Sequence, residues 1–272
     1  MHNPVFSLRN VCFSYLGKFP ALAGVDIDIR LKEKISIIGA NGTGKSTLLH
    51  LFDGLIFADS GEVNFCGAAF NEKCFSDSKF SRDFRRKVGF VFQNPEVQLF
   101  CPTVKEDIVF GPLQLGFGKD EVYKRLEKIV CDLGIGGLLD RSPHQLSIGE
   151  KRKVAIASVL IIHPDVLILD EPTAGLDPQT SRHIIDLLID ENAAGKTIIT
   201  STHDLHIVGE VSDIVYVFGE EKKIIKFGQP DHILNDAGLL SANNLVHIHR
   251  HRHNDKVHIH PHTHSEHHKE EH

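Results

Sequence analysis

The sequence lacks a basic surplus, a CxxC pair and a long apolar run, and each absence excludes a class of protein. The formal net charge is −6, so there is no basic footprint that would make nucleic acid the main partner. The cysteines are widely scattered, which indicates neither a zinc site nor a disulfide framework and fits a reducing cytosol. They are Cys12, Cys66, Cys74, Cys101 and Cys131.

Membrane-directed segments are also missing. The longest apolar stretch, residues 154–162, is too short to cross a bilayer, and no signal-peptide pattern is visible. If the protein works at a membrane, we expect another polypeptide to span it. The 272 residues suffice for one large domain or two modest ones with a substantial core.

A phosphate-binding motif is present at residues 39–47, which read GANGTGKST. It follows the apolar run 34–38, typical of a buried strand, and precedes a predicted helix. Its glycines let successive amide N–H groups point inward, and the helix beginning near Lys45 adds its positive end. We therefore expect a nucleotide triphosphate here, with Lys45 at the β- and γ-phosphates and the Ser46 hydroxyl on Mg²⁺. A glycine-rich turn that only joins strand to helix is the alternative. The loop residues are Gly39, Ala40, Asn41, Gly42, Thr43, Gly44, Lys45, Ser46 and Thr47.

Two adjacent carboxylates, Asp170 and Glu171, follow the unbroken apolar run 166–169. Such a run predicts a strand buried on both faces of a parallel sheet, whose carboxyl end shares an edge with the phosphate loop. At this edge Asp170 can support Mg²⁺, and Glu171 can orient or deprotonate a water near the γ-phosphate. A surface Asp-Glu pair is usually a solvated loop end, but its place after a buried strand favours catalysis. His203 follows the next predicted strand, 196–201, and this position on the ligand edge of the sheet favours a function over simple packing or capping.

The remaining patterns predict a layered α/β chain. Alternating residues between 5 and 31 predict antiparallel strands before the nucleotide core, and 88–92 is a second buried strand. We expect 71–87 to be loop plus a short helix, and about 100–150 to be a helical insertion. Ser147 and Glu150 have capping-box spacing, and an exposed helix start that carries Ser and Gly is also an anion site.

Taken in the order in which they occur along the chain, the motifs resemble those of the nucleotide-binding domain of ABC transporters, over roughly residues 4–240. The resemblance implies an α/β P-loop NTPase core with an antiparallel β subdomain and an inserted α-helical subdomain. It also implies that Tyr15 stacks on adenine, Gln93 contacts Mg²⁺ and senses the membrane partner, Glu171 polarises the attacking water and His203 holds the γ-phosphate. The motifs are the phosphate loop, the Gln93 loop, LSIGE at 146–150, ILDEP at 168–172, AGLD at 174–177, and His203.

The resemblance further implies a dimer, in which the LSIGE segment of one subunit covers the ATP of the other. Ser147, Gly149 and Glu150 would then act in trans, and Asp177 would lie at the dimer seam. Ile148 stands where the family normally has glycine. A homodimer is favoured over pairing with a related ATPase.

A narrower likeness, in 93–100 and 103–112, is to the ATPases of energy-coupling-factor importers, especially those for cobalt and nickel. It implies a peripheral subunit at the cytoplasmic face, partnered by a transmembrane coupling component and a substrate-binding membrane component. Vitamin or other small-solute uptake is the alternative cargo. A soluble ABC protein of translation or DNA repair would typically carry two nucleotide domains or coiled-coil inserts, and a metallochaperone would not need the intact catalytic set.

The composition changes after the ATP-binding domain, predicted as 1–245, to a histidine-rich segment, 246–272, that we expect to be disordered. Alternate histidines share a face of an extended chain, so neighbouring imidazoles can bind Ni²⁺, Co²⁺, Zn²⁺ or Cu²⁺. A purification tag would usually be an unbroken run. The predicted ligands are His247, His249, His251, His253, His258, His260, His262 and His264.

Overall fold

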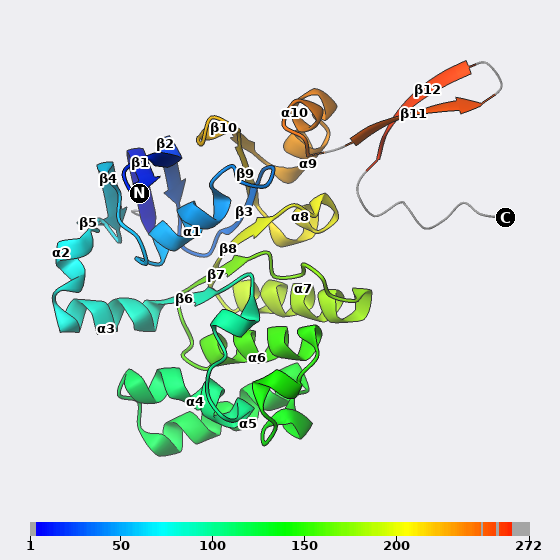
Figure 1. Cartoon of the computed structure of the whole chain (residues 1–272). Coiled ribbons are helices and arrows are strands. Elements are labelled where there is room, and N and C mark those ends of the chain that lie inside the picture. Colours follow the sequence, from blue (N-terminus) through cyan, green and yellow to red (C-terminus); the bar gives the residue numbers. More distant parts are fainter. Residues whose placement is uncertain (1–3, 246, 254–255, 263–272) are drawn as a thin grey trace.

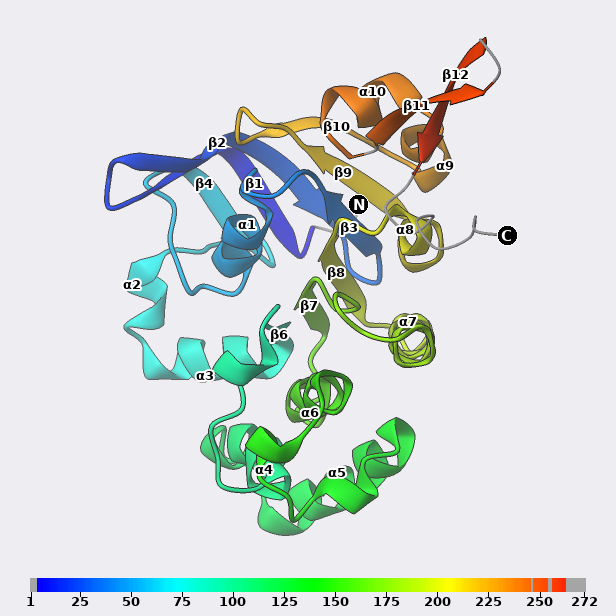
Figure 2. The same cartoon turned by 45° about the vertical axis from the view of Figure 1, so that its right-hand side comes forward.

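The computed structural model describes residues 4–245, 247–253 and 256–262. Its centre is a six-stranded sheet, seen in Figure 2 as a row that runs from β10 to β6. All neighbours in the row are parallel except β9 and β10, which are antiparallel. In spatial order the strands are β10 (Ile224–Gly228), β9 (Ile214–Phe218), β3 (Lys34–Ile38), β8 (Thr197–Thr202), β7 (Val166–Asp170) and β6 (Val88–Val91).

A second, four-stranded sheet is antiparallel and lies beside β9 and β3 (Figure 1). Its long strands are β1 and β2, paired from Phe6 opposite Ile29 to Tyr15 opposite Phe19. The order is β2 (Phe19–Ile29), β1 (Phe6–Tyr15), β4 (Ser60–Phe65) and β5 (Ala68–Ala69). This is the antiparallel subdomain that the alternating N-terminal sequence predicts.

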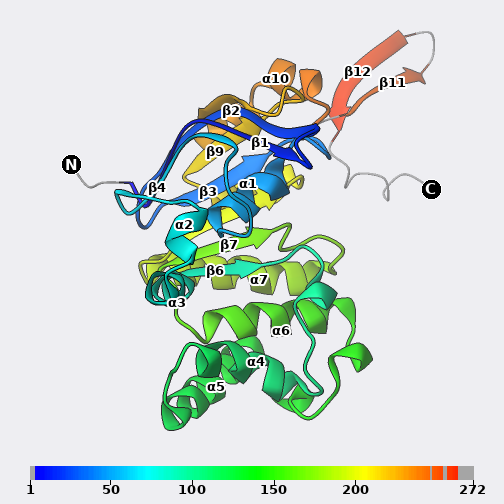
Figure 3. The same ribbon diagram turned by 60° about the vertical axis from the view of Figure 1, so that its left-hand side comes forward.

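Helices α4 (Val104–Gln114), α5 (Lys119–Leu133) and α6 (Ile148–Leu160) lie between β6 and β7 in the chain. In all three views they gather at the end of the molecule away from the antiparallel sheet (Figures 1 and 3). The other elements are α1 (Lys45–Phe52), α2 (Glu72–Phe75), α3 (Ser78–Lys87), α7 (Pro178–Ala193), α8 (Leu205–Val211), α9 (Pro230–Leu234), α10 (Ala237–Ala242) and the 3₁₀ turns Pro95–Val97, Gly136–Leu138 and Pro143–Gln145.

The core has two large parts because β7 is buried on both faces, as its unbroken apolar sequence predicts. Val166 and Ile168 pack in a cluster with α1 and the antiparallel sheet. Leu167 and Leu169 pack in a second cluster with α4 to α7. Helix α1 is thus held between the two sheets, which fixes the loop that precedes it.

These findings confirm the predicted fold class: a P-loop core with an antiparallel β subdomain and an inserted helical subdomain. Among the described residues, no helix combines the length and apolarity needed to cross a membrane.

In the histidine-rich segment, β11 (His247–His253) and β12 (Lys256–His262) form a two-stranded antiparallel sheet. The expectation of disorder stays a prediction, because 246, 254–255 and 263–272, and with them His264, lie outside the described residues.

Candidate active site

The carboxyl ends of four parallel strands bring the predicted site residues to one edge of the central sheet. Strand β3 leads into the phosphate loop, β6 into Gln93, β7 into Glu171 and β8 into His203. A cleft of about 510 Å³ opens there. Its walls contain Tyr15, Phe19, Pro20, Ala21, Asn41, Gly42, Gly44, Lys45, Ser46, Thr47, Gln93, Asp170 and Glu171.

Close approach and backbone angles explain the glycines of the loop. Gly44 has φ +117°, and a Cβ there would lie 2.3 Å from the Ala21 carbonyl oxygen. A Cβ at Gly39 would lie 2.7 Å from the Phe218 carbonyl oxygen. Larger residues at either position would therefore displace the backbone that the loop rests on.

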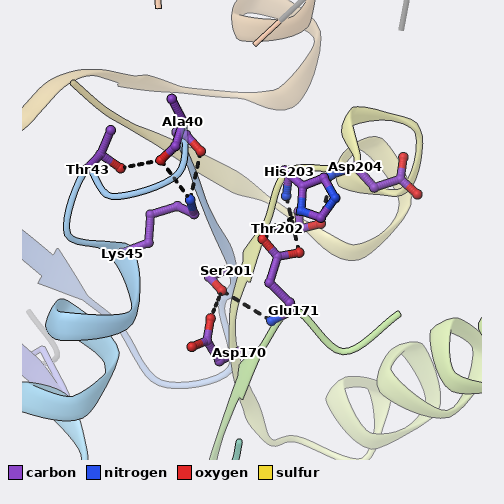
Figure 4. Close-up of polar contacts among 10 residues, drawn as sticks. Ala40, Thr43, Lys45, Asp170, Glu171, Ser201, Thr202, His203 and Asp204 are labelled. Atoms are coloured by element: carbon purple, nitrogen blue, oxygen red, sulfur yellow. Dashed lines mark hydrogen bonds and ion pairs between the residues drawn. The ribbon is translucent and has the colours of Figure 1, made fainter. Parts of the chain in front are cut away.

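Lys45 closes the loop on itself (Figure 4). Its Nζ donates to the carbonyl oxygens of Gly39 (2.7 Å) and Ala40 (3.1 Å). Burial lowers the pKa of this ammonium, while Glu171 and Asp170 act in the opposite direction. The lysine is thus a desolvated cation inside the cleft, and an anion would attract it strongly.

Asp170 and Glu171 are both buried and are fixed differently (Figure 4). Asp170 Oδ1 accepts a hydrogen bond from the Ser201 hydroxyl. Glu171 has φ +48°, a strained angle for a non-glycine residue. Its amide donates to Ser201 O (3.1 Å), and its Oε1 lies 2.9 Å from His203 Nδ1. Asp170 and Glu171 are therefore held beside Lys45 with different partners.

His203 lines a second cavity of about 480 Å³, which shares Glu171 with the first. The His203 side chain is 53% exposed, whereas that of Glu171 is 7% exposed, so the imidazole is the solvent-facing member of the pair. The second cavity is lined by Glu171, Thr173, Ala174, Gly175, Leu176, His203, Asp204, Leu205, His206 and Leu245.

Tyr15 and Gln93 flank the phosphate loop. Tyr15 lies 42% exposed at the end of β1, and its hydroxyl is 3.2 Å from Thr47 Oγ1. Its ring meets Phe13 edge-on, with 5.0 Å between centroids. Gln93 is exposed and follows β6. Both residues therefore lie where a nucleotide on the loop would meet them.

The LSIGE segment forms the start of α6 and contributes to neither cavity within the described part of the chain. Ser147 and Glu150 make the predicted capping box: Glu150 N donates to Ser147 Oγ (3.3 Å) and Ser147 N to Glu150 Oε2 (2.8 Å). Ile148 is 60% exposed. A Cβ at Gly149 would lie 3.4 Å from Thr180 Cγ2, and Thr180 N donates to the Asp177 cap of α7. The α6 start and Asp177 thus belong to one surface.

Arg152 is a residue of this region that the sequence analysis missed. It is only 2% exposed, and its guanidinium donates to Phe92 O (2.8 Å) and Gln93 O (2.6 Å). Gln98 makes a second link, donating from Nε2 to Ala155 O (2.8 Å). The loop that carries Gln93 is therefore fixed to α6, five residues after Ser147.

The cleft offers a donor set that suits Mg²⁺. Ser46, Gln93 and Asp170 each present oxygen and line the same cleft, and hard divalent cations prefer oxygen. For transition metals the result differs: among the side chains described in 4–245, no group of three or more His, Cys, Asp or Glu is placed to hold an ion.

Comparison with known proteins gives consistent results. A family profile described as ABC transporter matches residues 22–174. The nickel import ATP-binding protein NikO of Rhodobacter capsulatus is 46% identical over 246 residues, covering 89% of this chain and 96% of NikO. The energy-coupling factor transporter ATP-binding protein EcfA of Methanocaldococcus jannaschii is 42% identical, covering 89% of this chain and 85% of EcfA. The structure of cbiO1 from Clostridium perfringens, part of the transporter complex cbiONQ, superposes with a TM-score of 0.75 at 36% identity, covering 89% and 95% of the two chains.

Proposed function

Because the chain belongs to the ABC transporter ATP-binding family and is an ATPase coupled to transport, we propose that it powers uptake of nickel or cobalt ions through a separate transmembrane complex. The strongest support is the 46% identity to a nickel import ATP-binding protein along 89% of this chain. The likeness to cbiO1 and EcfA supports an energy-coupling-factor type of importer. Under this proposal the chain sits peripherally at the cytoplasmic face of the membrane.

ATP and Mg²⁺ are the cofactors of ABC ATPases. When bound, Mg²⁺ neutralises charge on the phosphate oxygens, and we assign Ser46, Asp170 and Gln93 to hold it. Lys45 would exchange the carbonyl oxygens of Gly39 and Ala40 for the β- and γ-phosphates, while the loop amides surround the phosphates. Tyr15 would stack on adenine.

Glu171 would act as the base that orients and deprotonates the attacking water. Its burial and its contact with His203 hold the carboxylate at one place, so little reorganisation is needed when the proton moves. His203, the exposed partner, would contact the γ-phosphate. The two residues share the wall between the cavities, so release of phosphate would change the contacts of both.

ABC ATPase cassettes work as dimers together with transmembrane components. We propose a homodimer in which Ser147, Gly149 and Glu150 of one copy close over the ATP of the other, with Asp177 at the seam. Neither cavity contains the α6 start, which agrees with its acting on a second copy. A coupling component and a substrate-binding component would complete the importer.

Uptake of radiolabelled nickel and cobalt by cells that express the importer tests this function. With Lys45→Ala we expect loss of nucleotide binding and of uptake, and with Glu171→Gln retained ATP binding without turnover. General-base removal should slow hydrolysis by about 10²-fold or more. The control is Cys131→Ser, an exposed position outside both cavities.

Two results would contradict the proposal. Undiminished hydrolysis in both variants would remove the site assignment. Suppose instead that the cells take up a vitamin or another small solute, and neither nickel nor cobalt, and that this uptake requires Lys45. The assigned cargo would then be wrong, while the assignment as a transport ATPase would stand.

A further inference from the structure

The register of the histidine hairpin pairs histidine with histidine. His247 lies opposite His262, His249 opposite His260, and His251 opposite His258. The alternate positions pair Ile248 with Pro261, Arg250 with Ile259, and Arg252 with Val257. Because successive residues of a strand belong to opposite faces, the three histidine pairs share one face of the hairpin.

Two neighbouring pairs have the spacing of a metal site. Residues directly opposite in an antiparallel pair have Cβ atoms about 5 Å apart, and the next pair on the same face is about 7 Å along the strand. His249, His260, His251 and His258 are thus four neighbouring positions on one face of the hairpin, and four imidazoles suffice for one transition-metal ion. Imidazole nitrogen suits Ni²⁺, Co²⁺, Zn²⁺ and Cu²⁺ and not Mg²⁺, so the ion would not be the one that serves ATP.

The hairpin also needs a ligand for its stability. Its two strands form a sheet of their own. An isolated two-stranded hairpin is at best marginally stable in water. Metal binding that is coupled to folding supplies the missing free energy. A metal-bound form of the segment would therefore be more stable than the metal-free form.

The hairpin is attached to the wall of the second cavity. Leu245 is buried there, in the cavity that also contains Glu171 and His203. β11 begins at His247, two residues after Leu245, a distance of at most about 7 Å along the chain. Ala174, Gly175 and Leu176, which precede the proposed dimer seam at Asp177, line the same cavity. A folded body at this attachment lies next to the surface on which the second copy would close.

We propose that a divalent transition-metal ion, bound by His249, His251, His258 and His260, folds the hairpin and thereby slows ATP hydrolysis. Ions of the transported class would then limit their own uptake. Only this limitation of uptake rests on the proposed cargo. Metal binding by the hairpin and the slower ATP hydrolysis are properties of the chain itself.

The test uses the purified full chain and two variants that remove four histidines each. The hairpin variant carries His249→Gln, His251→Gln, His258→Gln and His260→Gln. The matched control carries His232→Gln, His267→Gln, His268→Gln and His272→Gln, none of which is among the predicted ligands. Co²⁺ binding is followed by visible absorption and calorimetry, and ATP hydrolysis is measured in excess Mg²⁺ with and without micromolar Ni²⁺.

We expect the natural chain and the matched control to show the cobalt–imidazole bands and to lose hydrolysis about fivefold or more with Ni²⁺. The hairpin variant should show neither effect. Metal binding and slowing that persist in the hairpin variant would overturn the proposal, and so would binding without slowing in the natural chain. Nickel uptake by a metal-insensitive ATPase would refute this inference alone, whereas metal-sensitive hydrolysis without nickel or cobalt uptake would refute only the cargo.

Discussion

At the residue scale, burial has a larger effect on the pKa of Asp53 than the ion pair that this residue makes with Arg85. Asp53 caps the end of α1, is 4% exposed and lies 2.8 Å from Arg85 Nη1. Loss of water raises the pKa of its carboxyl from 3.8 to about 6, although Arg85 acts to lower it. The folded chain therefore holds this proton more tightly than the unfolded chain. The resulting stability is complete below 3.8 and is lost as the pH rises through about 6.

We predict that Asp53→Asn removes this pH dependence. Between about pH 4 and about pH 7 the natural chain should lose up to about 3 kcal/mol of unfolding free energy relative to the variant, at 1.36 kcal/mol per pH unit. Urea unfolding across that range measures the difference, with Asp83→Asn, at an exposed position on α3, as the control for removing a carboxylate. A difference between natural chain and variant that stays constant with pH would contradict the prediction.

The site residues that could be predicted are marked by the sequence immediately around them, whereas the one that was missed depends on contacts with distant parts of the chain. Lys45, Asp170 and Glu171 were identifiable because each follows an apolar strand at a fixed spacing. Arg152 gave no such signal, since a lone arginine in a helix usually faces solvent. Its burial depends on the carbonyl groups of Phe92 and Gln93, 60 and 59 residues away in the chain.

At the scale of single elements, the start of α6 has two separable properties. Its capping box stabilises the helix, and we propose that its exposed N-terminus meets the phosphates bound by the other copy. Asp is as good an N-cap as Ser and suits the positive end of the helix, but it repels phosphate.

We therefore predict that Ser147→Asp keeps the thermal midpoint of the natural chain and lowers ATP hydrolysis at least about tenfold, a change of about 1.4 kcal/mol in activation free energy. Ser147→Ala, which removes the cap, should instead cost about 1 kcal/mol of stability. Calorimetry and a phosphate-release assay measure the two effects. Hydrolysis at the natural rate in Ser147→Asp would mean that the serine serves the helix only.

The elements were predictable where periodicity was strong, as in β3, β7 and α5. The stretch 71–87 was predicted as loop plus a short helix, and the structure contains both α2 and the ten-residue α3. Helix α3 is polar overall, and only Phe84 is buried in it. Aromatic contacts with Phe70 and Phe75, each about 5 Å between centroids, hold that helix.

At the scale of the whole molecule, the parallel order of β3, β6, β7 and β8 explains why strand ends far apart in the sequence meet in one cleft. That convergence follows from the sequence, because carboxyl ends of parallel strands share an edge. The positions of the α6 start and Asp177 do not follow in the same way. The α6 start depends on the helical insertion and Asp177 on the segment between β7 and α7, and their proposed partner is a second copy.

We propose that ATP is enclosed between two copies of the chain, each lending its phosphate loop to the Ser147 helix of the other. The most direct test is the mass of Glu171→Gln by sedimentation, with ATP and Mg²⁺ and with neither, because this variant should bind ATP without consuming it. We predict a doubling of mass with ATP and Mg²⁺, and no doubling when Ser147→Arg is added. A strictly monomeric Glu171→Gln chain, even beside its transmembrane components, would contradict the account.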